Sequence, residues 1–311
     1  METIKKDNSG TLSLPENLEK LLTDCTLCPR NCHVNRMAGQ IGYCLQTGTL
    51  RAARAALHYW EEPCISGTAG SGAVFFGGCS MRCVFCQNHD IAAGEAGREI
   101  SVERLKEIFL ELQEKGANNI NLVTPTHFVP LIVPALRAAK REGLRIPIVY
   151  NTSSYEKVST LQLLDGLVDI YLPDMKFVSP VLSKRYTGRE DYFERASEAI
   201  SFMAKKPLRM DGEGKMLSGI IVRHLLMPLG VADSFEVLKW FKREMPATAY
   251  LSLMSQYTPF GETEKFSELR RPVTAREYES VLNEAFALGI ENLFLQKRSS
   301  SGEKYIPKWD F

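Results

Sequence analysis

Three cysteines have the spacing of ligands to an iron-sulfur cluster. Cys79, Cys83 and Cys86 form a C-x3-C-x2-C motif that directly follows a Gly-Gly pair. A cubane cluster contains four irons, so three thiolates leave one iron open to another ligand. A pure electron carrier has no use for an open iron, whereas a cofactor or substrate can bind there. The motif therefore indicates a reactive 4Fe-4S cluster.

The competing interpretation is that these thiols are buried, or bind zinc, without chemistry. Structural zinc usually takes four protein ligands, and the nearest candidate for a fourth is His89, three residues after Cys86. A histidine at such a place is more often a loop residue than a ligand. The spacing therefore favours the cluster.

Four cysteines further upstream form a second set of metal ligands. Cys25, Cys28, Cys32 and Cys44 have the spacing C-x2-C-x3-C-x11-C. Four thiolates can close a site completely, and both zinc and iron-sulfur clusters accept them. The set is either a structural zinc site or an auxiliary cluster, and the lack of an open position favours a structural metal. Cys64 is left over and is expected to be a small buried or half-buried side chain, with a role as an alternative ligand as the minor interpretation.

The distribution of cysteine and charge limits the class of protein. All eight cysteines lie between residues 25 and 86, whereas the disulfides of a secreted domain are usually spread over it. The net charge of +1 gives no long-range attraction to nucleic acid or to an anionic membrane. No apolar run reaches the roughly 18 residues of a membrane-spanning helix. We expect a soluble, cytoplasmic protein that binds neither a membrane nor nucleic acid.

The segments that position these cysteines alternate between strands and helices from about residue 72 onward. Strands are expected at 73–77, 120–123, 146–150, 169–172, 220–226, 250–254 and 292–295. The stretches between them have apolar residues three and four apart, and Ser101 is suited to cap the first helix. Such alternation predicts a parallel sheet, and parallel barrels carry their chemistry at the carboxyl ends of the strands. The cluster motif and several polar segments follow strands in this way.

The chain is expected to divide into four parts. These are a tail with a short helix (1–24), a cysteine-rich metal-binding extension (25–68), a barrel core (69–298) and a C-terminal tail (299–311). The short helix is expected at 16–22, a turn at 209–215 and a mobile loop at 299–302.

The cluster motif resembles that of the radical S-adenosylmethionine (SAM) superfamily, because Phe85 completes its C-x3-C-x-aromatic-C signature. The longer string at 75–88, FFGGCSMRCVFCQN, is similar to uncharacterised iron-sulfur proteins described as homologues of pyruvate formate-lyase activating enzyme. Further similar segments begin at residues 25, 123, 150, 172, 222 and 253. The resemblance spans about residues 25–310.

The resemblance implies a fold, an activity and cofactors. The fold is α/β, a partial (β/α)6 radical SAM barrel with an N-terminal cysteine-rich extension. The activity is reductive cleavage of SAM at a 4Fe-4S cluster, which gives a 5′-deoxyadenosyl radical that abstracts hydrogen from a substrate inside the barrel. The substrate is either a glycine on a partner protein or a small molecule. An external donor of the flavodoxin or ferredoxin type is expected to supply the electron.

The resemblance also selects residues that contact SAM. Many members of the superfamily hold the SAM amino group with a Gly-Gly-Glu segment after the second strand. Here that place reads Thr-Pro-Thr-His, which makes Thr124, Thr126 and His127 the candidate contacts. Phe85 is a further cofactor-binding position. The other interpretation of His127, as a loop histidine, is equally good.

Two later segments are similar to the Asp-Thr and Asp-x-Lys segments of glycyl-radical activating enzymes, which lie near SAM and a bound cation. Asn151 replaces the aspartate of the first segment and is a candidate cofactor contact, but the loss of a negative charge argues against a cation site. Asp174 and Lys176 in the second are expected to position SAM or substrate, or else to form an ordinary ion pair. Arg223 and His224 alternate across a strand, so one faces the interior. We favour His224 as the SAM contact.

Two other functions stay open. One is a non-catalytic iron-sulfur electron carrier or redox sensor in which every cysteine is structural, and the three-thiol motif speaks against it. The other is an RNA-modifying radical SAM enzyme, and the near-zero net charge argues against that.

Overall fold

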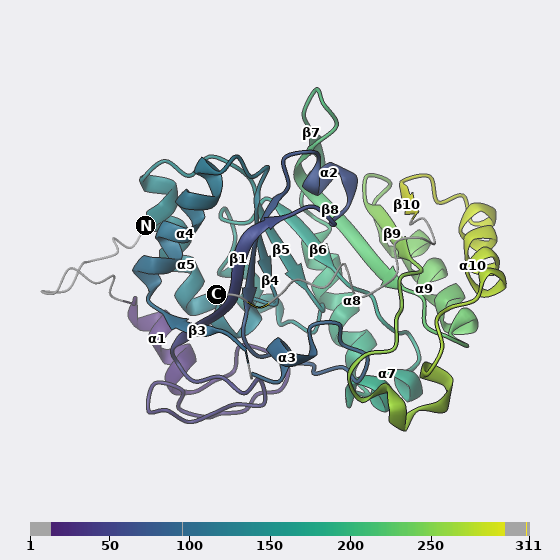
Figure 1. The fold of residues 1–311 in the computed structure, drawn as a ribbon, viewed down its shortest axis with the longest axis horizontal. Coiled ribbons are helices and arrows are strands. Elements are labelled where there is room, and N and C mark those ends of the chain that lie inside the picture. Colours follow the sequence, from purple (N-terminus) through teal and green to yellow (C-terminus); the bar gives the residue numbers. More distant parts are fainter. Residues whose placement is uncertain (1–13, 95, 296–308, 310–311) are drawn as a thin grey trace, which may run out of the picture.

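Ten strands form one mixed sheet in the computed structural model, which describes residues 14–94, 96–295 and 309 (Figure 1). The strands are β1 (Leu50–His58), β2 (Ser71–Phe76), β3 (Arg98–Ile100), β4 (Ile120–Val123), β5 (Ile148–Thr152), β6 (Ile170–Pro173), β7 (Arg209–Met210), β8 (Met216–Leu225), β9 (Tyr250–Met254) and β10 (Leu293–Leu295). Their order is β10-β9-β8-β6-β5-β4-β2-β1-β3, and β7 pairs with β8. The run from β10 to β2 is parallel, whereas β1, β3 and β7 are antiparallel to their neighbours.

Helices connect the successive parallel strands. The α-helices are α1 (Glu16–Thr23), α2 (Pro63–Ser66), α3 (His89–Ala92), α4 (Val102–Glu114), α5 (Val129–Arg141), α6 (Val158–Gln162), α7 (Pro180–Thr187), α8 (Tyr192–Met203), α9 (Val231–Glu244) and α10 (Ala275–Ala287). Short 3-10 helices are η1 (Thr126–Phe128), η2 (Gly261–Lys265) and η3 (Ser267–Leu269). Helix α4 packs on α5 and α9 packs on α10, and Figure 1 shows these pairs at opposite ends of the sheet.

This arrangement confirms the predicted α/β class. The six parallel strands β2, β4, β5, β6, β8 and β9 are those expected of the partial barrel, and β10 adds a seventh. The predicted cap of α4 is also confirmed, since the Ser101 hydroxyl accepts a hydrogen bond from the backbone N–H of Arg104 at 3.0 Å.

The parallel strands are apolar because both of their faces are covered. Every residue of β2, β4, β5 and β6 is buried, as is usual for such sheets. Asn121, Asn151 and Ser252 are polar exceptions on β4, β5 and β9 that are buried as well. Because a buried polar group needs a partner, these residues mark a polar site inside the fold.

Most strand predictions are confirmed, and the differences have local causes. The predicted bounds of β4 and β9 are those of the structure, while β5 begins two residues late and includes Asn151 and Thr152. The turn predicted at 209–215 is shorter, because Arg209–Met210 pairs with β8 and only the residues around Asp211 turn. The Asp211 carboxylate accepts hydrogen bonds from the N–H groups of Glu213 and Lys215 there. Strand β1 was not predicted, because Leu-Arg-Ala-Ala-Arg-Ala-Ala-Leu-His lacks a strict alternation.

The cysteine-rich extension and the barrel share one sheet. Strand β1 belongs to the extension, and its residues from Ala52 to His58 pair with the whole length of β2, so the boundary expected at residue 69 falls within the sheet. Ala52 pairs with Phe76 at the end of β2, and His58 pairs with Ser71 at its beginning. The segment after His58 therefore enters at the amino ends of the parallel strands, opposite the cluster motif.

The chain ends lie mostly outside the described residues. The helix expected at 16–22 is confirmed as α1, while the loop expected at 299–302 and most of the C-terminal tail fall outside that part of the chain. Among the helices described, none has the length and apolar character needed to cross a membrane.

Candidate functional site

The cluster motif lies in the loop that follows β2. Cys79, Cys83 and Cys86 line one cavity of about 520 Å³ at the carboxyl ends of the parallel strands. Gly78, the second residue of the loop, has φ +78°, and a side chain there would clash with the carbonyl oxygen of Cys44. Glycine is therefore required where the loop crosses the N-terminal extension. The backbone N–H of Met81 points to the Cys79 sulfur at 3.3 Å.

The thiols fit a three-ligand cluster in chemistry and position. Burial raises the pKa of Cys83 and of Cys86 to about 12, so metal coordination is what favours their thiolate forms. In the part of the chain that the structure describes, no three Cys, His, Asp or Glu side chains are arranged to hold a single metal ion. A cubane binds each thiolate at a separate iron and does not need the three sulfurs to meet at one point.

Five of the predicted cofactor-binding residues line the same cavity. They are Phe85, Thr124, Asn151, Asp174 and Lys176. Thr124 directly follows β4 and lies in the left-handed region with φ +57°, an uncommon conformation for a β-branched residue. The carboxyl ends of β4, β5 and β6 therefore bring these side chains to the mouth that the cysteines occupy.

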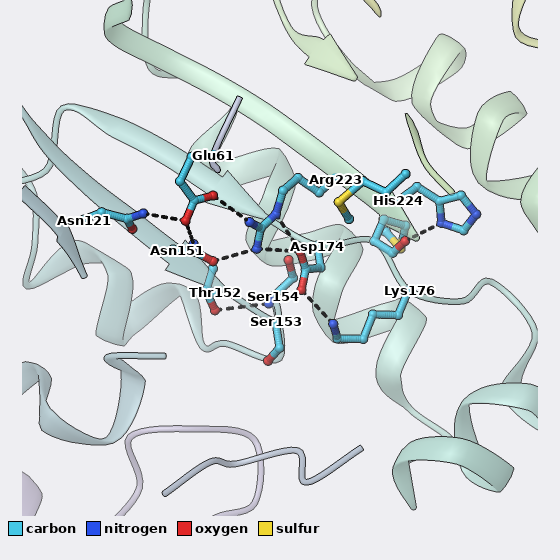
Figure 2. Close-up of polar contacts among 12 residues, drawn as sticks. Glu61, Asn121, Asn151, Thr152, Ser153, Ser154, Asp174, Lys176, Arg223 and His224 are labelled. Atoms are coloured by element: carbon cyan, nitrogen blue, oxygen red, sulfur yellow. Dashed lines mark hydrogen bonds and ion pairs between the residues drawn. The ribbon is translucent and has the colours of Figure 1, made fainter. Parts of the chain in front are cut away.

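Arg223 is the centre of a polar network in this cavity (Figure 2). Its guanidinium donates to the Asp174 carboxylate at 2.9 Å and to the Asn151 side-chain oxygen at 2.6 Å. A third contact, at 3.4 Å, joins it to the Glu61 carboxylate. Asp174 also accepts a hydrogen bond from the Lys176 ammonium at 2.6 Å. Two cations and two carboxylates thus alternate along the cavity wall.

Amides complete the network at its other end. The Glu61 carboxylate accepts hydrogen bonds from the side-chain amides of Asn121, at 2.9 Å, and Asn151, at 3.4 Å. Glu61 comes from the segment between β1 and α2, while Asn121 and Asn151 lie on β4 and β5. The network therefore ties the extension to the interior of the sheet.

The charged groups in this network shift one another's pKa values. Burial alone would raise the pKa of Asp174, but Arg223 and Lys176 outweigh it and hold this pKa below the usual range. Burial raises the pKa of Glu61 and of its neighbour Glu62, against the opposing charge of Arg223. Asp174 is therefore firmly ionised, and the two glutamates are the carboxyls whose charge is most costly to bury.

Two predicted SAM contacts, Thr126 and His127, lie outside the cavity lining. The Thr126 hydroxyl donates to the Glu156 carboxylate at 2.6 Å. The His127 Nε2 lies 2.6 Å from the carbonyl oxygen of Gly77, and burial lowers its pKa to about 3. A neutral imidazole that donates to Gly77 holds the start of the cluster loop. His127 is thus placed as a positioning residue.

The structure places Arg223, and not the preferred His224, on the wall of the cavity. Arg223 faces the cavity, whereas His224 points away from it toward α9 (Figure 2). The His224 ring nitrogens lie 2.7 Å from the Met175 carbonyl oxygen and 2.8 Å from the Ser234 hydroxyl. The alternation was predicted correctly, but a long charged side chain with two carboxylate partners occupies the interior.

Glu156 is a buried carboxyl that the sequence did not single out. It accepts hydrogen bonds from the hydroxyls of Thr126 and Thr152, at 2.6 and 2.5 Å, and of Tyr150 at 3.2 Å. Burial raises its pKa to about 7. It joins the loops after β4 and β5, and no periodicity in the sequence would reveal it.

The raised pKa of Glu156 predicts a specific pH dependence of stability. A carboxyl whose folded pKa exceeds its unfolded value of 4.5 favours folding below that value, and the benefit is lost as the pH rises toward 7. From acidic to neutral pH, we expect the free energy of unfolding of Glu156→Gln to rise by about 2 to 3 kcal/mol relative to that of the wild type. Urea denaturation across this range measures the gain. The exposed control Glu114→Gln should show the same pH dependence of stability as the wild type. If the curve of stability against pH for Glu156→Gln were parallel to that of the wild type, the prediction would be contradicted.

The N-terminal cysteines gather beside the cluster loop. A side chain at Gly42 would lie 3.6 Å from the Cys32 sulfur and 3.7 Å from the Cys44 sulfur. The backbone N–H of Tyr43 points to the Cys32 sulfur at 3.4 Å. Cys25 and Cys44 are buried, and Cys28 is partly so. Cys64 lies apart, buried in an apolar cluster with Ile65 and Met216, as expected.

Aromatic stacking joins this extension to the cluster loop. The Arg30 guanidinium lies 3.4 Å from the centre of the Tyr43 ring, and that of Arg82 lies 4.2 Å from it. Arg30 also donates to the carbonyl oxygen of Ser80 at 2.9 Å. The four-cysteine segment is thus fixed against the loop that carries Cys79 and Cys83.

Comparisons with known proteins agree with this geometry. Residues 73–211 match the family model of the radical SAM superfamily. An uncharacterized protein of Methanocaldococcus jannaschii is 27% identical over 287 residues, which are 90% of this chain and 79% of that protein. The pyruvate formate-lyase 1-activating enzyme of Escherichia coli K12 is 23% identical over 215 residues, 64% of this chain and 81% of that enzyme.

Among solved structures, Streptococcus suis SuiB bound to its precursor peptide SuiA has a TM-score of 0.50 and 13% identity. The match covers 70% of this chain and 46% of SuiB, so this chain spans less than half of that protein. Similarity at this level concerns the fold alone. The segment that matches the radical SAM superfamily, residues 73–211, includes the three-cysteine motif and the cavity-lining residues from Phe75 to Phe177, and it is therefore a radical SAM superfamily domain.

Proposed function

We propose that this chain reductively cleaves SAM at a 4Fe-4S cluster bound by Cys79, Cys83 and Cys86. The observation that carries the proposal is that all three thiols open onto one cavity of about 520 Å³ lined with hydrogen-bonding side chains. When bound, the cluster supplies the electron that breaks the sulfur to C5′ bond of SAM and gives a 5′-deoxyadenosyl radical. The radical SAM domain supports both cofactors.

The chain's own residues bind SAM and shield it. In this proposal Thr124 and Lys176 donate hydrogen bonds to the SAM carboxylate, and Asp174 accepts one from its amino group. All three line the cavity with the cysteines. Apolar side chains of Phe85 and Met254 also line it and exclude water. His127 keeps the cluster loop in place from outside.

Arg223 takes the place of a bound cation in this site. Its guanidinium lies between Asn151 and Asp174, in the two segments that are similar to a cation-binding site of activating enzymes. A fixed positive charge makes a separate metal cation unnecessary and repels one. We expect SAM cleavage to be the same in potassium buffer and in tetramethylammonium buffer. A stimulation by K⁺ or Na⁺ of about tenfold or more would contradict this assignment.

The N-terminal cysteines are proposed to hold a structural metal with four thiolate ligands. Because the described side chains do not converge on a single ion, the four sulfurs must draw together when the metal binds. Burial raises the pKa of Cys28 to about 12, so a metal ion is needed to stabilise its thiolate. We expect the purified protein to contain about four irons and one zinc per chain, and Cys32→Ser to lose the zinc alone. A count of about eight irons would instead assign an auxiliary cluster to these residues.

The electron donor is proposed to be of the flavodoxin or ferredoxin type, and the substrate a partner protein or a small molecule. The rival function is a non-catalytic electron carrier or redox sensor. Electron paramagnetic resonance of the reduced protein distinguishes the two, because SAM at an open iron changes the spectrum of the cluster. A spectrum that is identical with and without SAM would favour the carrier.

A further inference from the structure

We propose that residues 58–62 form the substrate side of the cavity and bind a protonated primary amine at Glu62. The inference rests on the proposed function only in calling this ligand the substrate. It concerns a segment outside the matched domain at 73–211. All five residues, from His58 to Glu62, line the cavity that the three cysteines line.

The position of this segment separates it from the SAM side. Because β1 is antiparallel to β2, the chain after His58 enters at the amino ends of the parallel strands. The cysteines, Thr124 and Lys176 follow the carboxyl ends of those strands. Glu61 nevertheless reaches Arg223 and Asn121 inside the sheet. The segment therefore closes the cavity from the end opposite the cluster loop.

The cavity contains one more carboxylate than it has cations. Asp174 is bonded to both Lys176 and Arg223, and Glu61 is bonded to Arg223 and to two amides. Two cations thus balance two carboxylates. Glu62 is only 8% exposed, and its Oε2 is buried without a hydrogen-bond partner among the described residues. A buried carboxylate oxygen is costly to leave unpaired, so this atom is a ready acceptor for a ligand.

Aromatic side chains that line the same cavity as Glu62 favour a cationic ligand. Tyr59 and Trp60 are 49% and 62% exposed although they line the cavity, and Phe75 lines it as well. The faces of such rings attract ammonium groups. A primary ammonium has three donors, which suits a carboxylate with an unpaired oxygen. A carboxylate or phosphate ligand would be repelled by Glu61 and Glu62.

An ammonium group can come from a free small amine or from a lysine side chain of a peptide. Both present the same chemistry to Glu62, and the experiment distinguishes them. The probes are 1,5-diaminopentane and its matched diol, 1,5-pentanediol, and a blocked pentapeptide with one central lysine and its acetyl-lysine form. Binding of each to the cluster-loaded protein with SAM present is measured by isothermal titration calorimetry.

We expect at least one amine probe to bind and its uncharged counterpart to bind at least about tenfold more weakly. Binding of the diamine alone assigns a small-molecule ligand, and binding of the lysine peptide alone assigns a peptide. Glu62→Gln should weaken binding of the amine at least about tenfold, whereas the exposed control Glu279→Gln should leave binding unchanged. Trp60→Leu is a second variant that should weaken it, should Glu62→Gln fail to fold.

Three results would overturn the inference: no amine binds, the uncharged probes bind equally well, or Glu62→Gln and Trp60→Leu both bind as the wild type does. The proposed function is tested separately by SAM cleavage with dithionite and no amine. SAM cleavage without amine binding would support the proposed function and contradict this inference. Amine binding that depends on Glu62, without SAM cleavage, would support the amine site and contradict the proposed function.

Discussion

Cys83→Ala is expected to abolish SAM cleavage while the chain stays folded. The thiol is one of three at the cavity, and its loss leaves the cluster with too few ligands. Loss of an outer-shell partner of a metal already costs roughly 10- to 100-fold, so loss of a ligand should cost more than about 100-fold. The measurement is 5′-deoxyadenosine formed under anaerobic conditions from SAM and dithionite, with iron counted in the same samples.

Cys64→Ala is the matched control for that variant. Cys64 is also buried, but it lies in an apolar cluster and is not among the residues that line the cavity. We expect it to keep its iron and its rate of SAM cleavage. Equal loss of activity in both variants would mean that cysteine removal damages the fold, and full activity of Cys83→Ala would exclude this thiol as a cluster ligand.

The largest effect on stability is expected from Arg223→Met. The guanidinium pairs with Asp174 and Glu61 in a buried site, and removing one partner leaves charges without compensation. Such losses cost about 3 to 5 kcal/mol. Chemical denaturation near neutral pH measures the cost. The exposed control Arg141→Met should change the free energy of unfolding by less than about 0.5 kcal/mol.

The pH dependence of that cost has a definite sign. Arg223 helps to keep the pKa of Asp174 below its usual range, so the pairing stabilises the fold above the unfolded pKa and is lost as the pH falls. Without the guanidinium, the pKa of Asp174 rises and the carboxyl becomes protonated in mild acid. The deficit of Arg223→Met should therefore shrink as the pH is lowered. A deficit that is small at neutral pH, or that grows in acid, would contradict the assigned ion pairs.

Much of the fold was predictable because parallel strands are apolar runs with helices between them. Ile120–Val123 and Tyr250–Met254 are clear from local sequence alone. Strand β1 was missed because its alanine-rich sequence acquires strand character from pairing with β2, a long-range interaction. The short strands β3 and β7 depend on their neighbours in the same way.

The site was predictable where a motif fixes the chemistry and not where packing fixes it. The cysteine spacing identified one end of the cavity, and the polar segments at the end of β5 and after β6 identified its wall. Glu61 and Glu62 were missed, although two carboxylates before Pro63 are the kind of signal that could have found them. His224 was preferred to Arg223 because alternation says which residues oppose each other but not which face is inside.

The most direct test of the central claim is SAM cleavage by the wild-type chain after anaerobic reconstitution with iron and sulfide. We predict that SAM and dithionite give 5′-deoxyadenosine and methionine in equal amounts, and that omission of either abolishes the product. A fully loaded cluster that takes up the electron but neither binds nor cleaves SAM would contradict the claim. The electron carrier or redox sensor would then be the function that this cavity supports.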